Sequence, residues 1–255
     1  MTAKVSLEEK FRETGGKRSY VQRLFGRIAR IYDLMNHLMS FGLDWRWRAF
    51  AARYLALGTG ELGLDLGAGT ADLSIAVVRR SGPGTRMIGL DITPEMLELG
   101  RSKVTRLGLQ DQIELRVGDA EQIDLPDNSV DGCCSAFMMR NVGDIRQVFR
   151  EMLRVVRPGG RVVCLEISHP PGRVFGTLFH FYFYQLAPLF GTIIGKAFEE
   201  YNYLPHSLTN FPDAPGLKAL MEEVGWDDVR FYRLTGGIVA VHVGTKPENI
   251  IPGET

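Results

Sequence analysis

The stretch LDLGAGT, residues Leu64–Thr70, decides the fold of this chain. It ends an apolar run, Glu61–Leu66, that predicts a short buried strand, and the helical pattern of Asp72–Arg80 follows it. The glycines at 67 and 69 allow the backbone to bend sharply and to approach a ligand without a Cβ in the way. A strand, a glycine turn and a helix in this order predict a nucleotide-type cofactor site.

A second apolar run, Met87–Leu90, predicts another buried strand, and it ends in the carboxylate of Asp91. In a parallel sheet the carboxyl ends of the strands meet the ligand, and a carboxylate there can accept hydrogen bonds from a ribose. The sequence therefore predicts a cofactor that carries a nucleoside.

The turn also indicates which cofactor this is. A dinucleotide fingerprint would have a third glycine at position 72, but this chain has Asp72, which would repel a pyrophosphate. Asp65 is a further acid, suited to a cationic amino group. S-adenosylmethionine has an ammonium, a ribose and no phosphate, so it fits better than NAD. The expected cofactor-binding residues are Asp65, Gly67, Gly69, Thr70, Asp91, Ile92, Met96, Asp119, Ala120 and Ala136.

Strands and helices alternate along the rest of the chain, which predicts an α/β fold with a doubly wound, mostly parallel sheet of seven strands. A C-terminal pair of strands around Thr235–Gly237 predicts an antiparallel hairpin, which is typical of the Rossmann-like class I methyltransferases that use S-adenosylmethionine. The expected later elements are the strands Ile113–Val117, Val130–Ala136, Arg161–Ile167, Val229–Leu234 and Ile238–Thr245, and the helix Ile145–Val156, closed by Arg157–Gly160.

The chain divides into an N-terminal helical segment, residues 1–57, that forms part of a cap, and a cofactor-binding domain, residues 58–255. Tyr20–Leu57 is expected to be helical, with one apolar stripe between Val21 and Tyr32, and Trp45 and Trp47 are expected to pack. A cap insertion is expected at residues 169–215. Within it, Val174–Gly195 has no charged residue and many aromatic ones, so it is core, an aromatic lid over an apolar substrate, or a surface that touches a bilayer.

The composition excludes several classes of protein. Thirty acidic and thirty basic residues give a net charge of zero, which argues against a nucleic-acid-binding protein. The three cysteines and five histidines have neither a disulfide framework nor metal-ligand spacing, so no metal is expected. The polar N-terminus has no secretory signal, so the expected location is cytoplasmic, with transient contact to a membrane surface. The oligomeric state, a homodimer included, stays open.

Two long motifs resemble the signatures of the ubiquinone/menaquinone biosynthesis C-methyltransferases. The first is Tyr32–Asn36 with Met39, Ser40 and Trp47, and the second runs from Arg154 through Gly160 to Glu166–Ser168. Shorter blocks extend the resemblance from about Tyr20 to Lys246: Phe137–Asn141, Tyr203–Ser207 and Gly237–Ala240.

The resemblance implies methylation of a ring carbon of a prenylated quinol, with a naphthoquinol or a benzoquinol ring. It also implies that Arg140 and Asn141 are catalytic, because the pair in this family is proposed to polarise a water that takes the phenol proton. The alternative for Arg140 is a surface ion pair. Glu166 either faces the pocket or pairs with an arginine. The expected substrate-binding residues are Tyr32, Asn36, Phe137, Tyr203 and His206.

The chain departs from the family pattern at two positions, where Asp44 replaces a histidine and Ala71 replaces a glycine. We expect the methyl group of Ala71 to narrow the methionine end of the cofactor pocket. Two other functions stay open at this point. One is a methyltransferase that acts on another lipid or phenolic molecule, and the other is an inactive cofactor-binding scaffold of a quinone-biosynthesis complex.

Overall fold

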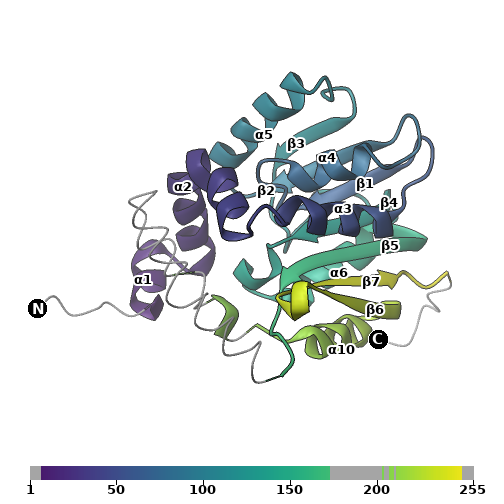
Figure 1. Ribbon diagram of the computed structural model, residues 1–255. Coiled ribbons are helices and arrows are strands. Elements are labelled where there is room, and N and C mark those ends of the chain that lie inside the picture. Colours follow the sequence, from purple (N-terminus) through teal and green to yellow (C-terminus); the bar gives the residue numbers. More distant parts are fainter. Residues whose placement is uncertain (1–6, 173–202, 204–206, 210, 249–255) are drawn as a thin grey trace, which may run out of the picture.

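A computed structural model describes residues 7–172, 203, 207–209 and 211–248 of the chain. Within them one sheet has the strand order β3-β2-β1-β4-β5-β7-β6 (Figure 1). The five strands β1 to β5 are parallel, whereas β7 is antiparallel to both β5 and β6. The expected fold class is therefore confirmed, including the C-terminal hairpin. The strands are β1 Leu62–Leu66, β2 Arg86–Asp91, β3 Ile113–Val117, β4 Val130–Ala136, β5 Val156–Ile167, β6 Asp227–Leu234 and β7 Val239–Thr245.

Helices cover both faces of the sheet. On one face α3 (Asp44–Leu55), α4 (Asp72–Val78) and α5 (Pro94–Arg106) pack on buried side chains such as Ala52, Leu73 and Leu97. On the other face α6 (Ile145–Val155) and α10 (Ala214–Val224) pack around Phe149 and Trp226, which are almost fully buried. The strand ends are thus held between two apolar layers, and this fixes the edge at which a ligand meets the sheet.

The fifth strand begins earlier than the sequence predicts. Val156 already pairs with Val130, and the register then shifts before Arg161 pairs with Gly132. The Arg157–Gly160 segment, expected to be a turn, is therefore part of β5 and forms the irregularity. Only glycine fits at position 160, because a Cβ there would lie 2.6 Å from the carbonyl oxygen of Asp131.

The stretch Tyr20–Leu57 is helical as expected, but it is divided between two helices, α2 (Lys17–Met39) and α3. A turn separates the two helices where Phe41 and Gly42 both adopt left-handed backbone angles, φ 51° and 72°. Figure 1 shows α2, with α1 (Leu7–Thr14) beside it, near the ends of the central strands. By contrast, α3 packs on the face of the sheet. No helix in the described part of the chain is long and apolar enough to cross a membrane.

Candidate functional site

A cavity lies at the carboxyl ends of the parallel strands, where the sequence predicts the ligand. It is bounded by the turns after β1 to β4 and by one side of α2. Eleven of the expected site residues line it: Tyr32, Gly67, Gly69, Asp91, Ile92, Met96, Asp119, Ala120, Ala136, Phe137 and Asn141. Residues expected to bind the cofactor and residues expected to bind the substrate therefore share one cavity.

The turn after β1 is tied to the end of β2. The carboxylate of Asp91 accepts hydrogen bonds from the backbone N–H of Gly69, at 2.9 Å, and of Thr93, at 2.8 Å. Gly67 and Gly69 have left-handed φ angles of 66° and 53°, and a Cβ on Gly67 would collide with the side chain of Met138. Burial raises the pKa of Asp91 above its ordinary value. The carboxylate is held rigidly, and it lines the cavity as a ribose-binding group would.

Asp65 lies behind the turn and does not line the cavity. Its side chain is almost fully buried, and the hydroxyl of Ser74 donates to Oδ2 at 2.6 Å. Oδ1 has no hydrogen-bond partner within the described residues. Burial raises the pKa of Asp65 to about 7. A buried acceptor without a partner, next to a glycine turn, fits a group that serves a cationic amino group.

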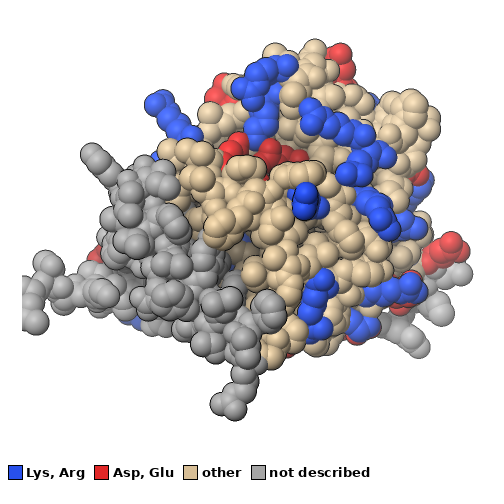
Figure 2. All heavy atoms as spheres, viewed as in Figure 1, with Lys and Arg blue, Asp and Glu red and all other residues tan. Residues whose placement is uncertain are grey.

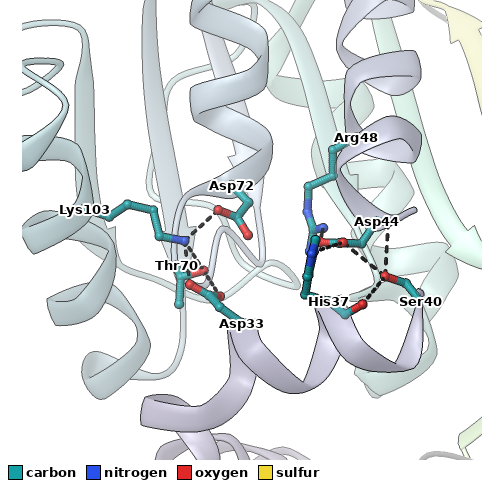
Figure 3. A network of polar contacts seen from close by, with 8 residues as sticks. All are labelled: Asp33, His37, Ser40, Asp44, Arg48, Thr70, Asp72 and Lys103. Carbon is teal, nitrogen blue, oxygen red and sulfur yellow. Dashed lines mark hydrogen bonds and ion pairs between the residues drawn. The ribbon is translucent and has the colours of Figure 1, made fainter. Parts of the chain in front are cut away.

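Thr70 connects the turn after β1 to α2 and does not line the cavity. Its hydroxyl donates to Asp33 at 2.7 Å, and the ammonium of Lys103 lies 2.6 Å from both Asp33 and Asp72. Figure 3 shows these four side chains as one group between α2, the turn and α5. Asp72, the acid at the position of the third fingerprint glycine, is thus paired with Lys103.

Helix α2 makes polar contacts with the segments that follow all four central strands. Asp33 holds the turn after β1, and Gln22 donates to the carbonyl of Ile92 after β2 at 2.7 Å. Arg18 pairs with Asp119 after β3 at 2.6 Å. After β4, Lys17 donates to the carbonyl oxygens of Arg140, at 3.2 Å, and Val142, at 2.6 Å. One helix therefore closes the cavity through contacts to every strand end that forms it.

The segment after β4 has a strained residue at its start. Phe137 lines the cavity with a left-handed φ of 59°, which is uncommon for a residue with a side chain. Its carbonyl oxygen accepts hydrogen bonds from the guanidinium of Arg140 and the amide of Asn141. The guanidinium of Arg48 lies over its ring, 5.4 Å from the centroid, and Trp47 contacts the ring edge-on. Phe137 is thus held in place both at its backbone carbonyl and at its ring.

Arg140 forms a buried ion pair with Glu166, at 2.7 Å, and the exposed fractions of the two side chains are only 4% and 2%. Of the two possibilities for Glu166, pairing with an arginine is confirmed, and the alternative that placed Arg140 at the surface is wrong. Arg140 does not itself line the cavity, whereas its neighbours Phe137 and Asn141 do. Within the described residues, Nε of Arg140 and Oδ1 of Asn141 are buried without a partner. Such atoms fit a ligand or water at this point.

The expected substrate-binding residues have different places. Tyr32 lines the cavity. Asn36 forms a side-chain hydrogen bond with Tyr32 but does not itself line the cavity. Tyr203 is buried, its ring packs near Tyr20, and its hydroxyl has no partner in the described part of the chain. Burial raises the pKa of Tyr203 to about 12. His206 and the Val174–Gly195 stretch lie outside the described residues, and those predictions stay as they are.

The two departures from the family pattern have structural roles. Asp44 accepts from Arg48 at 2.7 Å and contacts His37 and Ser40, so it holds the arginine that lies over Phe137 (Figure 3). Ala71 has a left-handed φ of 69°, a conformation in which glycine is favoured. Its methyl group is fully buried and does not line the cavity.

Sequence reasoning missed Lys17, Arg18, Gln22 and Arg48 as parts of the site. Lys17, Arg18 and Gln22 precede the first signature motif, and polar positions on a helix give no signal of what they will contact. Arg48 directly follows Trp47 of that motif, and this position could have indicated that Arg48 belongs to the site. The described residues contain no group of three or more His, Cys, Asp or Glu side chains that could hold a metal ion.

The doubly wound sheet with an antiparallel hairpin, a glycine turn after β1 and a carboxylate after β2 defines a class I methyltransferase fold. A methyltransferase from Thermotoga maritima superposes with a TM-score of 0.63 over 88% of this chain and 99% of that one, at 16% identity. Phosphoethanolamine N-methyltransferase 2 of Haemonchus contortus, solved with S-adenosylmethionine, gives 0.57 over 76% of this chain and 50% of that one, also at 16% identity. At these identities the likeness shows the fold alone.

The model of the ubiE/COQ5 methyltransferase family matches residues 13–246, so the chain belongs to this family and is a methyltransferase. It is 41% identical to the ubiquinone/menaquinone biosynthesis C-methyltransferase UbiE of Geobacter sp. strain M21, over 89% of this chain and 96% of that protein. It is 38% identical to the demethylmenaquinone methyltransferase of Bacillus cytotoxicus, over 91% of this chain and 98% of that one.

The buried carboxyl of Asp65 makes stability depend on pH. Its pKa is about 7 in the folded chain and 3.8 ordinarily, so folding favours the protonated form. Stability from this group is full at low pH and is lost as pH rises from about 4 to about 7. We therefore expect Asp65→Asn to raise the free energy of unfolding at pH 8 by about 2–4 kcal/mol. The gain should shrink steadily as pH falls, in urea titrations of both proteins.

Glu98→Gln is the matched control, because that carboxylate is 74% exposed. It should change the free energy of unfolding by less than about 0.5 kcal/mol at any pH. Parallel pH profiles for Asp65→Asn and the unchanged protein would contradict the assignment of a raised pKa to Asp65.

Proposed function

We propose that the chain is a C-methyltransferase that uses S-adenosylmethionine to methylate the ring carbon of a prenylated quinol, converting demethylmenaquinol to menaquinol. The observation that carries this proposal is the shared cavity. Asp91 and the glycine turn line one part of it, while Tyr32, Phe137 and Asn141 line another. Its relatives act in ubiquinone and menaquinone biosynthesis by their names, which supports a quinol as the substrate class.

The residues on the cofactor side fit S-adenosylmethionine. Asp91 offers carboxylate oxygens to the ribose hydroxyls, and Asp65 offers a partnerless buried oxygen behind the turn. Gly67 and Gly69 line the cavity in left-handed conformations that favour glycine. When bound, the cofactor supplies an electrophilic methyl group on a sulfonium. The protein's part is to hold that group next to the acceptor, which is worth several kcal/mol of the barrier.

The residues on the substrate side fit an aromatic ring with a phenolic hydroxyl. Tyr32 and Phe137 offer flat apolar surfaces, and contacts with Arg48 and Trp47 keep the ring of Phe137 in place. A ring carbon is a weak nucleophile, and loss of the phenol proton moves electron density onto it. The partnerless Oδ1 of Asn141 can accept a hydrogen bond from the phenol or from a water that takes its proton.

Arg140 supplies positive charge close to the developing phenolate. Its guanidinium lies behind the residues that line the cavity and donates a hydrogen bond to the carbonyl oxygen of Phe137. The positive charge is therefore already oriented toward the cavity before the substrate binds. Glu166 holds the guanidinium in place and partly neutralises it. After transfer of the methyl group, the ring carbon loses its proton to water and the phenolic oxygen takes up a proton, which restores the aromatic quinol.

A prenylated quinol is insoluble in water, so the reaction takes place where the cytoplasm meets a membrane. The proposal is tested by incubating the protein with labelled S-adenosylmethionine and demethyl quinols of both ring types, followed by mass analysis of the products. We expect one methyl group on a ring carbon of the naphthoquinol. Methylation of other phenols alone would favour the broader lipid or phenol methyltransferase. Cofactor binding without any turnover would favour the scaffold.

We expect Asp91→Ala to weaken binding of S-adenosylmethionine about ten- to a hundredfold, because hydrogen bonds between the ribose and a charged group are lost. Isothermal titration calorimetry measures this directly. Glu98→Ala is the control, since it removes an exposed carboxylate of α5 outside the cavity, and its affinity should stay unchanged. A folded Asp91→Ala protein with normal affinity would show that the ribose lies elsewhere.

Arg140 is best tested without leaving Glu166 as an unpaired buried charge, which costs about 3–5 kcal/mol. We therefore compare the unchanged protein with the double variant Arg140→Gln and Glu166→Gln, whose side chains can still form a neutral hydrogen bond. The double variant should turn over at least about a hundredfold more slowly than the unchanged protein, the scale of losing one positioned electrostatic group. Cofactor affinity should be the same in both. Equal turnover would show that Arg140 has only a structural role.

A further inference from the structure

Lys103, in the last turn of α5, joins three segments that meet beside the cofactor turn. Its ammonium lies 2.6 Å from Asp33 of α2, 2.6 Å from Asp72 at the start of α4, and 3.1 Å from the hydroxyl of Thr70 in the turn (Figure 3). Within the described residues no other basic side chain pairs with either carboxylate. We call Asp33, Thr70, Asp72 and Lys103 the junction.

The place of Lys103 follows from a close approach of α5 to the cofactor turn. A Cβ on Gly100 would lie 3.2 Å from the carbonyl oxygen of Gly69, which is tighter than an ordinary contact. Glycine therefore lets the two backbones meet, and Lys103 stands three residues later on the same side of the helix. Gly69 also donates to Asp91, which lines the cavity. The junction is thus one residue from the turn that faces the cofactor.

Helix α2 needs such a contact because it lies outside the apolar layers of the sheet. Its buried side chains form a cluster that is separate from the two clusters on the faces of the sheet: Val21, Leu24, Ile28 and Met35, with Tyr203. Lys17, Arg18 and Gln22 hold the first turns of α2 to the strand ends. Asp33 lies about three turns further along. The junction therefore joins the second half of α2 to the cofactor turn.

We propose that Lys103 is a positioning residue that holds α2 closed over the cavity and sets how long S-adenosylmethionine stays bound. The inference deepens the proposed function and rests on its cofactor. Helix α2 supplies four residues of the lining: Arg18, Val21, Phe25 and Tyr32. A ligand in the cavity is therefore covered by this helix. Lys103 does not itself line the cavity and acts through Asp33 and Thr70.

The balance of charge explains how one lysine controls the helix. Asp33 and Asp72 contact the same nitrogen atom, so their carboxylates lie close together and would repel each other without it. Figure 2 shows acidic side chains on the surface between α2, α4 and α5, with Lys and Arg side chains beside them. Loss of Lys103 turns the attraction between α2 and α4 into repulsion. The closed position of α2 is then less populated, and the apparent affinity of a ligand that requires it falls in proportion.

Stopped-flow measurement of cofactor release tests the role of Lys103. Lys103→Met should release S-adenosylmethionine at least about tenfold faster than the unchanged protein, because the closed position is less populated. The KM for the cofactor should rise, while kcat at saturating substrates should stay within about threefold. Lys218→Met is the matched control, because it breaks an ion pair with Glu222 on α10, on the other face of the sheet. Its release rate should be normal.

A second carboxylate variant separates repulsion from simple loss of structure. Asp33→Asn removes the link to α2 without creating repulsion, so its release should be only moderately faster. Asp33→Asn with Lys103→Met should release the cofactor more slowly than Lys103→Met alone, because the repulsion is gone. High salt should also narrow the gap between Lys103→Met and the unchanged protein, since both carboxylates are partly exposed. A double variant that is faster than both single variants would overturn the proposal.

Hydrogen exchange without cofactor separates this inference from the proposed function. Amides in the second half of α2 should exchange at least about tenfold faster in Lys103→Met, with those of β1 and β4 unchanged. That result in a chain that binds no S-adenosylmethionine would support the role of Lys103 and reject the proposed cofactor. Normal exchange and normal cofactor release in Lys103→Met, in a chain that methylates a quinol, would reject the role and support the proposed function.

Discussion

The structure of the site depends on the polar contacts of one helix, α2, with the segments after β1, β2, β3 and β4. The sheet alone would present its strand ends to solvent, as every doubly wound sheet does. Asp33, Gln22, Arg18 and Lys17 each reach a different segment and turn that open edge into an enclosed cavity. The contacts are hydrogen bonds and ion pairs, which are individually weaker than buried apolar packing and are reversible. A cofactor has to enter and leave this cavity. Because the contacts of α2 can break and form again, the cavity can open while the sheet stays folded.

A second constraint joins the ends of β4 and β5. Glu166 ends β5 and Arg140 follows β4, so their buried ion pair fixes the segment between Phe137 and Asn141 relative to the sheet. The same segment contains the left-handed Phe137, a conformation that persists only where its surroundings hold it. Arg48 over the ring and the two donors to the carbonyl provide that support. Asp44 positions Arg48 in turn, so the residue that departs from the family pattern contributes to the same wall.

Much of the fold could be predicted from the sequence, because buried strands and glycine turns have strong local patterns. Ile113–Val117 and Val130–Ala136 were predicted with their observed bounds, and Asp91 was predicted to lie at the cavity. Contacts between distant segments could not be predicted. Nothing near Lys17 indicates that it binds carbonyl groups more than a hundred residues later, and nothing local pairs Glu166 with Arg140. The break between α2 and α3 was missed for another reason. Phe41–Gly42 interrupts a helical pattern that an apolar stripe alone would continue, and the exposure of Trp45 depends on that break.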